Sequence, residues 1–219
     1  MKPLHNILCH AIVAGLLVAS SCTAETVRKD VPYVPTPKPV VEAMLNAADV
    51  KKGDVVYDLG CGDGRIVITA ARERGARGVG VDIDPQRIRE SIANARQAGV
   101  QDKVKFVNED LFKMDFDDAT VLTLYLLPDV NMRLRPKILQ MRPGTRVVSH
   151  SFDMGDWKPD QTIQVKESAN RTIHFWVVPA NVAGTWDCAV HGGDQRMKLQ
   201  LQQKHQQVEG TAQVNGRQL

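Results

Sequence analysis

The glycine-rich stretch at residues 58–64, which reads DLGCGDG, carries the clearest chemical pattern in the sequence. It lies between an apolar, strand-like run and a segment of helical periodicity. Glycines at such a junction let the backbone turn sharply and approach a ligand closely, while the helix start offers free N–H groups. Asp82 ends the next predicted strand, 20 residues after Gly62, where a carboxylate accepts hydrogen bonds from a ribose diol. Loop and acid together indicate a site for an adenosine-containing cofactor.

The spacing of the glycines narrows the choice of cofactor. Dinucleotide-binding loops read G-x-G-x-x-G, whereas the glycines here are Gly60, Gly62 and Gly64. Arg65 occupies the place of the third dehydrogenase glycine, and its bulk would hinder close helix–strand packing there. A P-loop is excluded because no Gly-Lys-Ser/Thr sequence follows. The stretch 58–64 instead resembles the first motif of class I S-adenosylmethionine-dependent methyltransferases.

This resemblance covers about residues 33–150 and implies S-adenosyl-L-methionine as the cofactor. Residues 80–85 (GVDIDP) resemble the second motif of that family, and residues 108–111 (NEDL) resemble the third. The cofactor-binding positions that it implies are Tyr33, Asp58, Gly60, Cys61, Gly62, Asp82, Ile83, Asp110 and Leu111.

The family's motifs also imply a role for each side chain. Asp58 would orient the glycine loop and, through it, the methionine amino group, which the loop backbone would face. Asp82 would hold the ribose hydroxyls, and Ile83 would pack against the adenine. Asp110 would accept a hydrogen bond from the adenine amino group, with the backbone of Leu111 nearby. A helix cap or a solvated turn acid is the alternative for Asp110.

A narrower resemblance concerns the flanks of the glycine loop. Residues 32–37 (PYVPTP), followed by DLGCGDGRIV, resemble the lysine methyltransferase branch of the ATP synthase c-subunit enzymes and, more distantly, of the Dot1 type. In that branch the Tyr-Val-Pro element helps close over the cofactor, which gives Tyr33 this role; an exposed loop tyrosine is the alternative. Amino-methylating relatives often carry Asn/Asp-Pro-Pro-Tyr at the position of 125–128, which here reads YLLP. Because no Asn or Asp directly precedes Pro128, the acceptor stays open between a protein lysine and a small molecule.

Tyr125 is the catalytic candidate, as a residue that positions the acceptor. It ends the fourth predicted strand, and open α/β sheets bind their ligands at the carboxyl ends of the strands. A strand aromatic buried in the core is the alternative. His150 and Asp153, which follow the fifth predicted strand, are weaker candidates. Methyl transfer is an in-line displacement at an already activated carbon, so the sequence needs no dedicated acid–base pair.

The fold class is predicted from alternating strand and helix patterns after Asp54. Apolar runs alternate with segments of period 3.6, and an Asp84-Pro85 pair marks one helix start. This alternation predicts a doubly wound, mostly parallel α/β sheet with an antiparallel end. The predicted strands are 55–57, 79–81, 104–107, 121–127, 145–149, 162–165 and 172–178, and the predicted helices are 65–74, one from Thr36-Pro37 with Val40, Val41, Met44 and Leu45 inward, one from Asp84-Pro85 with Ile88, Ile92 and Ala95 inward, and one capped by Asp129 with Met132 and Leu139 inward.

From residue 181 onward the pattern is purely β and predicts a small meander beside the methyltransferase domain of residues 25–180. Residues 197–201 (MKLQL) alternate strictly, and Gly192-Gly193 and Asn215-Gly216 are typical of hairpin turns. Only three residues follow the second turn, which is short for a return strand. The sequence therefore predicts a truncated chain, or a missing strand that another molecule supplies.

Residues 1–24 have the features of a secretory signal peptide. An apolar run of about 13 residues follows Lys2, too short for a span of about 20, and small residues precede Glu25. The protein is therefore expected to be exported, periplasmic or secreted. An uncleaved N-terminal membrane anchor is the alternative, and lipid attachment at Cys22 is a further one. A disulfide between Cys61 and Cys188 is open in an oxidising compartment, although Cys61 is better interpreted as a small packing residue.

The composition limits the classes of partner. With 43% hydrophobic and 24% charged residues, the 219-residue chain is neither collagen-like, nor a coiled coil, nor fully disordered. A net charge of +3 and only 5% aromatic residues argue against nucleic acid, and scattered histidines argue against a metal. Two hypotheses stay open. One is a methyltransferase; the other is a noncatalytic secreted binding protein on the same scaffold, which the export signal motivates.

Overall fold

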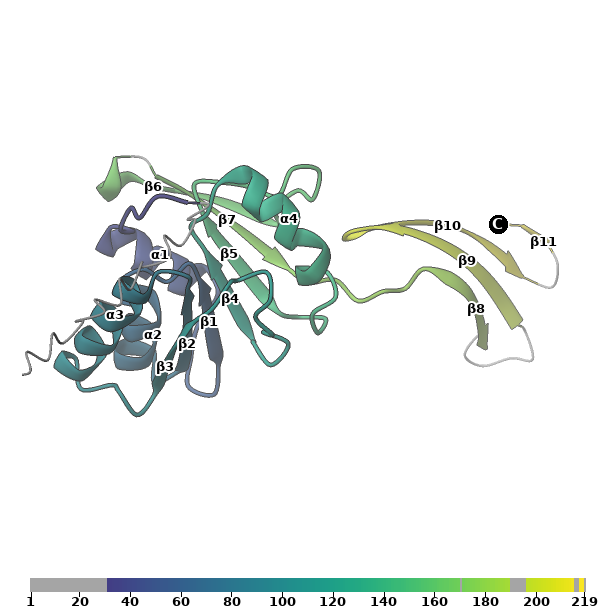
Figure 1. The fold of residues 1–219 in the computed structure, drawn as a ribbon. Coiled ribbons are helices and arrows are strands. Elements are labelled where there is room, and N and C mark those ends of the chain that lie inside the picture. Colours follow the sequence, from purple (N-terminus) through teal and green to yellow (C-terminus); the bar gives the residue numbers. More distant parts are fainter. Residues whose placement is uncertain (1–30, 170, 190–195, 215–216, 219) are drawn as a thin grey trace, which may run out of the picture.

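The computed structural model describes residues 31–169, 171–189, 196–214 and 217–218. Its main part is a seven-stranded sheet in the order β3-β2-β1-β4-β5-β7-β6 (Figure 1). The first five strands in this order are parallel, and β7 and β6 complete the sheet in antiparallel fashion. The strands are β1 (Val55–Leu59), β2 (Arg77–Asp82), β3 (Val104–Asn108), β4 (Val121–Leu124), β5 (Arg146–His150), β6 (Gln161–Val165) and β7 (Arg171–Val177).

Helices cover both faces of this sheet, as the alternating pattern predicts. Val55, Tyr57 and Leu59 of β1 belong to the apolar cluster that includes α4, whereas Val56 belongs to the cluster of α1 and α2. Successive side chains of a strand point to opposite faces, so one strand feeds both cores. The helices are α1 (Lys38–Ala47), α2 (Arg65–Arg74), α3 (Pro85–Gln97), α4 (Pro128–Ile138) and the short 3₁₀ helix η1 (Lys166–Ser168).

The first three α-helices begin where the sequence indicates. The main chain of Gln86 donates to the side chain of Asp84 at 2.9 Å, which confirms Asp84 as the N-cap of α3. All four predicted inward residues of α1 are buried. Of the predicted inward residues of α3, Ile88 and Ala95 are buried, but Ile92 is 37% exposed.

The transition from β4 to α4 differs from the prediction. The apolar run is a strand only as far as Leu124, and α4 begins at Pro128 with Leu127 as its N-cap, so Asp129 lies in the first turn and is not the cap. Met132 is 37% exposed. The buried face of α4 is instead formed by Val130, Asn131, Leu134 and Ile138. Pro128 starts the helix early, because proline suits the first helical turn and cannot donate to a strand ladder.

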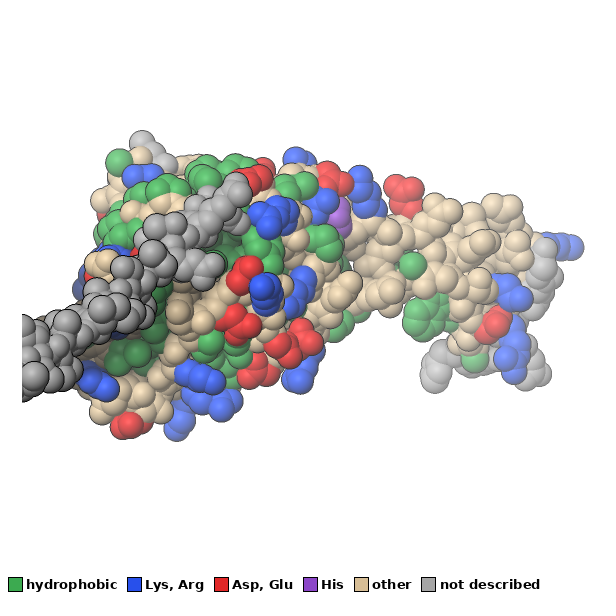
Figure 2. Space-filling model, in the orientation of Figure 1, with side chains coloured by type: hydrophobic (Ala, Val, Ile, Leu, Met, Phe, Trp, Pro, Cys, Tyr) green, Lys and Arg blue, Asp and Glu red, His purple; other side chains and the backbone are tan. Residues whose placement is uncertain are grey.

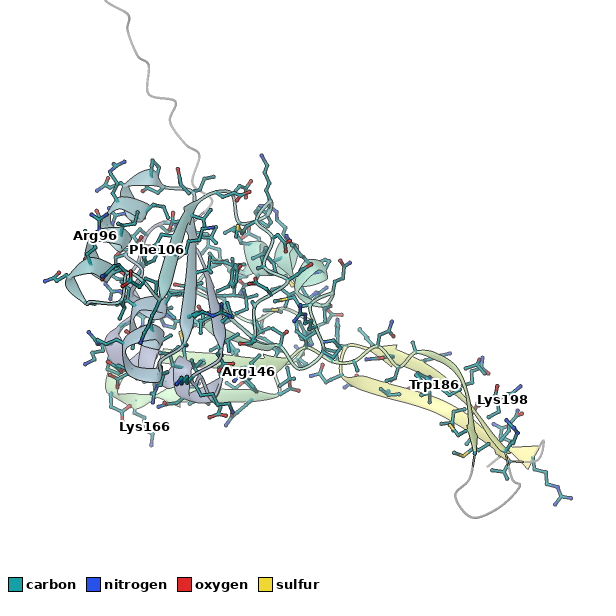
Figure 3. All side chains as sticks on the ribbon, turned by 90° about the horizontal axis from the view of Figure 1, so that it is seen from below. Arg96, Phe106, Arg146, Lys166, Trp186 and Lys198 are labelled. Atoms are coloured by element: carbon teal, nitrogen blue, oxygen red, sulfur yellow. The ribbon has the colours of Figure 1, made fainter. Side chains whose placement is uncertain are left out.

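A second sheet follows the main body and projects away from it as a single layer (Figures 1 and 3). We call it the appended sheet; its antiparallel order is β11-β10-β9-β8. Along β9 exposed and half-buried residues alternate strictly, as the sequence predicts. The turns predicted at residues 192–193 and 215–216 lie outside the described residues. The strands are β8 (Gly184–Ala189), β9 (Arg196–Lys204), β10 (Gln207–Val214) and β11 (Arg217–Gln218).

The turn between β9 and β10 holds the appended sheet against the body. The side-chain amide of Gln206 donates to the carbonyl of Lys158 at 2.7 Å, and Lys204 pairs with Asp156 at 3.1 Å. Arg135 of α4 pairs with the same Asp156 carboxylate. No helix in the described part of the chain is both long enough and apolar enough to cross a membrane.

Candidate functional site

The glycine loop connects β1 to α2 at the point where the strand order reverses, with β2 on one side of β1 and β4 on the other. Gly60, Gly62 and Gly64 have φ angles of 80°, 54° and 78°, which side-chain-bearing residues rarely adopt. A Cβ on Gly62 would lie 2.5 Å from the ring of Tyr33, and one on Gly60 would lie 2.8 Å from Leu126. The loop therefore requires glycine both for its turn and for the close approach of its neighbours.

Asp58 lies at the end of β1, beneath this loop, and is only 2% exposed. Thr123 of β4 donates its hydroxyl to the Asp58 carboxylate at 2.7 Å. Burial raises the pKa of Asp58 to about 7, and the nearby carboxylates of Asp82 and Asp63 act in the same direction. A cationic ligand group that enters the site would therefore stabilise the ionised form of this carboxylate.

Asp82 holds the glycine loop and the start of α3 together. Its two carboxylate oxygens accept the main-chain N–H groups of Gly62 and Asp84, each at 2.9 Å. Burial raises the pKa of Asp82 above its ordinary value, although these two donors act in the opposite direction. Each oxygen keeps a second lone pair, so the side chain can still accept hydrogen bonds from a ligand.

The segment before α1 closes one side of the site. The ring of Tyr33 packs over Gly62, and the guanidinium of Arg87 lies 4.4 Å above its centroid. Arg65 binds Asp63 through two nitrogens and donates to the carbonyl of Thr36 at 2.8 Å. Burial alone would raise the pKa of Asp63, but the paired Arg65 holds it below its ordinary value.

The opposite end of the site carries aromatic rings. The ring of Tyr125, just after β4, lies 3.8 Å from that of His150 and stacks at 6.4 Å on that of Phe152. Asn131 of α4 donates to the carbonyls of Phe152 and Asp153, which fixes this loop against the helix. Tyr125 is thus more than a strand aromatic buried in the core, since it also lines the cavity described next.

One cavity of about 260 Å³ joins these features. Its walls come from the segment before α1 and from the carboxyl ends of β1, β2 and β4 together with the loop after β3, where an open α/β sheet binds its ligand. The ten main candidates from the sequence line it: Tyr33, Asp58, Gly60, Cys61, Gly62, Asp82, Ile83, Asp110, Leu111 and Tyr125. The two weaker candidates, His150 and Asp153, do not line it.

Comparison with known proteins identifies the family. The chain is 47% identical over 151 residues to a protein-lysine N-methyltransferase of Saccharolobus islandicus, covering 68% of this chain and 94% of that one. The chain belongs to the S-adenosylmethionine-dependent methyltransferases. A family model described as the ANTKMT methyltransferase domain matches residues 58–161 of this methyltransferase.

Two further relatives agree with this assignment. A crystal structure from Salinibacter ruber, described as an RNA methyltransferase in complex with S-adenosyl-L-homocysteine, is 55% identical with a TM-score of 0.66, covering 68% of this chain and 96% of that one. The lysine N-methyltransferase of the mouse ATP synthase c-subunit is 33% identical over 69% of this chain and 62% of its own length. S-adenosylmethionine is therefore the cofactor of this methyltransferase, as the motif resemblance implies.

The residues present fit that cofactor. Gly60 and Gly62 line the cavity, and a Cβ at either position would collide with Leu126 or Tyr33, which line it too. Asp58 would supply a buried carboxylate for the cationic methionine end, and Asp82 would supply an acceptor for the ribose; both contacts stay predictions. Among the described residues no group of three or more His, Cys, Asp or Glu side chains is arranged to hold a metal ion.

Two predicted roles need a finer description. The carboxylate of Asp110 accepts the main-chain N–H of Phe112 at 2.9 Å, so it stabilises a turn and lines the cavity at once. Asp110 therefore acts as a turn acid and also lies where a cofactor-binding residue would lie. Its contact with adenine stays a prediction. Cys61 and Cys188 are both free thiols. Burial raises the pKa of Cys61, in keeping with a packing role.

The sequence interpretation missed part of the cavity wall. Arg87, in the first turn of α3, and Phe112, after β3, line the cavity without a motif of their own. Arg87 reaches the site only because α3 is packed so that its guanidinium stacks on Tyr33. Helical periodicity alone would place such an arginine on the solvent face, so no sequence signal distinguishes it.

Proposed function

We propose that this methyltransferase is a class I enzyme of EC 2.1.1 that methylates the side-chain amine of a protein lysine. The observation that carries the proposal is the 47% identity to the Saccharolobus islandicus protein-lysine N-methyltransferase over 94% of that protein. The mouse relative supports the same class of acceptor at lower identity. Its methyl acceptor is therefore expected to be a protein.

The chemistry asks little of the side chains beyond placement. Bound S-adenosylmethionine supplies a methyl group activated on a sulfonium sulfur. The chain must align the amine, exclude water and favour the neutral amine. We assign the alignment to Tyr125, because it lines the cavity at the carboxyl end of β4 and its ring is held by two others.

RNA is the second candidate acceptor, since the Salinibacter ruber relative is described as an RNA methyltransferase. The composition favours protein over RNA. A net charge of +3 and 5% aromatic residues provide little for phosphate binding and base stacking.

The proposed location is outside the cytoplasm, periplasmic or secreted, with an N-terminal membrane anchor as the alternative. It rests on residues 1–24, which lie outside the described part of the chain. The mass of the mature protein tests it: an N-terminus at Glu25 supports export with cleavage, whereas an intact Met1 contradicts cleavage and fits only the uncleaved anchor.

The first test is calorimetric titration with S-adenosylmethionine and S-adenosylhomocysteine. We expect micromolar binding, roughly −8 kcal/mol, and a loss of about 100-fold or more in Gly62→Val, because its side chain would meet the Tyr33 ring. Gly99→Ala is the matched control, since Gly99 also has a positive φ of 69° but open space around it. Unchanged affinity in Gly62→Val would contradict this cofactor site.

The second test identifies the acceptor. The protein is incubated with methyl-labelled cofactor and either a lysine-rich protein, the same protein with its lysines dimethylated, or RNA. Label that appears only on the unmodified protein supports lysine methylation. Label on RNA alone overturns the proposed acceptor, and cofactor binding without any transfer leaves a small-molecule acceptor and the noncatalytic binding protein.

A further inference from the structure

His150 occupies a central position that neither the cofactor nor the acceptor proposal explains. It ends β5, its side chain is fully buried, and its ring lies 3.8 Å from the ring of Tyr125. Burial lowers the pKa of His150 to about 4, and the charge of Arg171 acts in the same direction. The ring is therefore neutral at pH 7, so it places no positive charge beside a cavity that would hold a sulfonium.

The same ring also reaches the segment before α1. Nδ1 of His150 lies 3.3 Å from the hydroxyl of Thr36, within hydrogen-bonding distance, and Thr36 is only 4% exposed. The carbonyl of Thr36 in turn accepts from Arg65, which is bound to Asp63 of the glycine loop. One side chain thus contacts the aromatic end of the cavity and the segment that covers its cofactor end.

The other ring nitrogen adds to this picture. Nε2 of His150 is buried and has no hydrogen-bond partner among the described residues. An unsatisfied buried nitrogen carries a free-energy cost, which a residue kept only for packing could avoid with an apolar side chain. The presence of an imidazole at this position is therefore better explained by its contacts with Tyr125 and Thr36.

We propose that His150 is a positioning residue. It fixes the position of the Tyr125 ring relative to the segment before α1, which it contacts through Thr36, and so couples the acceptor end of the cavity to its cofactor end. The acceptor half of this inference rests on the proposed function of Tyr125. The cofactor half does not, because Thr36 itself lines the cavity.

The test is a double-mutant cycle between His150→Phe and Thr36→Val, followed by calorimetric titration with S-adenosylhomocysteine. Phenylalanine keeps a ring against Tyr125 but removes Nδ1, and valine removes the hydroxyl at almost constant shape. We expect each variant to weaken binding about three- to tenfold and the double variant to be no worse than either, because both remove the same hydrogen bond. Thr36→Ser, which restores the hydroxyl, should bind as the wild type does.

A spectroscopic readout separates positioning from general stability. The chain has three tyrosines, so fluorotyrosine labelling gives three ¹⁹F signals that Tyr→Phe variants assign. We expect Thr36→Val to shift the Tyr125 signal in the wild-type background and to leave it unchanged in His150→Phe. Circular dichroism confirms that each variant is folded, and Thr36→Val carries the test if His150→Phe is not.

The outcomes are distinct for the two proposals. Additive losses in the cycle, or a Tyr125 signal that ignores Thr36, would overturn the coupling role of His150. Non-additive losses together with label on RNA would leave that role intact and reject only the lysine acceptor.

Discussion

The main body and the appended sheet are built from similar strands but stabilised differently. In the body, β1 and β4 are buried along their whole length between helices, whereas in the appended sheet β9 alternates between exposed and half-buried residues. Trp176 of β7 is fully buried, whereas Trp186 of β8 is 45% exposed. Figure 3 labels Trp186 on the appended sheet. The appended sheet is thus held by strand pairing and by the contacts of the β9–β10 turn with the body, whereas the body has a packed core.

The surfaces of the two regions differ as well. Figure 2 shows acidic and basic side chains gathered over the body, while the visible face of the appended sheet is mostly uncharged.

The Saccharolobus islandicus and Salinibacter ruber relatives match about two thirds of this chain and nearly all of their own length. We therefore propose that the methyltransferase unit functions without the appended sheet, which a shortened chain tests below.

The largest expected effect is on the free energy of unfolding, which should differ between alanine variants of the two tryptophans. Trp176→Ala should lower the free energy of unfolding by about 3–5 kcal/mol, since it leaves a cavity in the core and removes the hydrogen bond from its indole to the carbonyl of Trp157. Trp186→Ala should cost about 1 kcal/mol or less. Urea unfolding followed by circular dichroism measures both, and equal costs would show that the appended sheet has a core of its own.

A smaller effect on stability is expected when the buried carboxylate of Asp58 is replaced. Because burial raises the pKa of Asp58 from an ordinary 3.8 to about 7, the folded state binds more protons than the unfolded state in this range. The stability contribution of Asp58 therefore falls as pH rises from about 4 to 7 and stays low above that. Asp58→Asn, which keeps an oxygen for Thr123, should raise the Tm of the free protein at pH 8 and weaken S-adenosylmethionine binding about tenfold.

The matched control for this prediction lies in the appended sheet. Asp187 of β8 is exposed, so Asp187→Asn should change neither Tm nor cofactor affinity. Thermal unfolding between pH 4 and 8, with titrations at pH 8, measures all of these quantities. A Tm of Asp58→Asn that follows the wild type at every pH would contradict the buried, protonatable carboxylate.

The smallest effect is expected from removing the appended sheet altogether. Every residue that lines the cavity lies between Val31 and Val130, so a chain ending at residue 180 should bind S-adenosylhomocysteine within about twofold of the full chain. Lys204→Met in the full chain is the milder control, because it breaks only the pair with Asp156. A tenfold loss in the shortened chain would mean that the appended sheet supports the site through its contacts with residues 156–160.

Local patterns explain why the cofactor site could be predicted from the sequence. The glycine loop and Asp82 act through the backbone conformation of a strand–helix junction, which residues close in sequence dictate. The same reasoning correctly placed the cap of α3 at Asp84, and it failed at α4, where Pro128 starts the helix before Asp129. A helix start is predicted correctly when a single residue sets the backbone conformation, and the prediction fails when two neighbouring residues favour different starts.

The sequence by itself determined the alternation of strands and helices, the glycine loop and the apolar alternation of the appended sheet. Only the tertiary structure decided that His150 meets Thr36 across 114 residues of chain and that Arg87 covers Tyr33. It also decided that no helix packs along the appended sheet among the described residues (Figure 1). Periodicity specifies which face of an element is apolar, whereas the partner of that face depends on the packing of segments far apart in the chain.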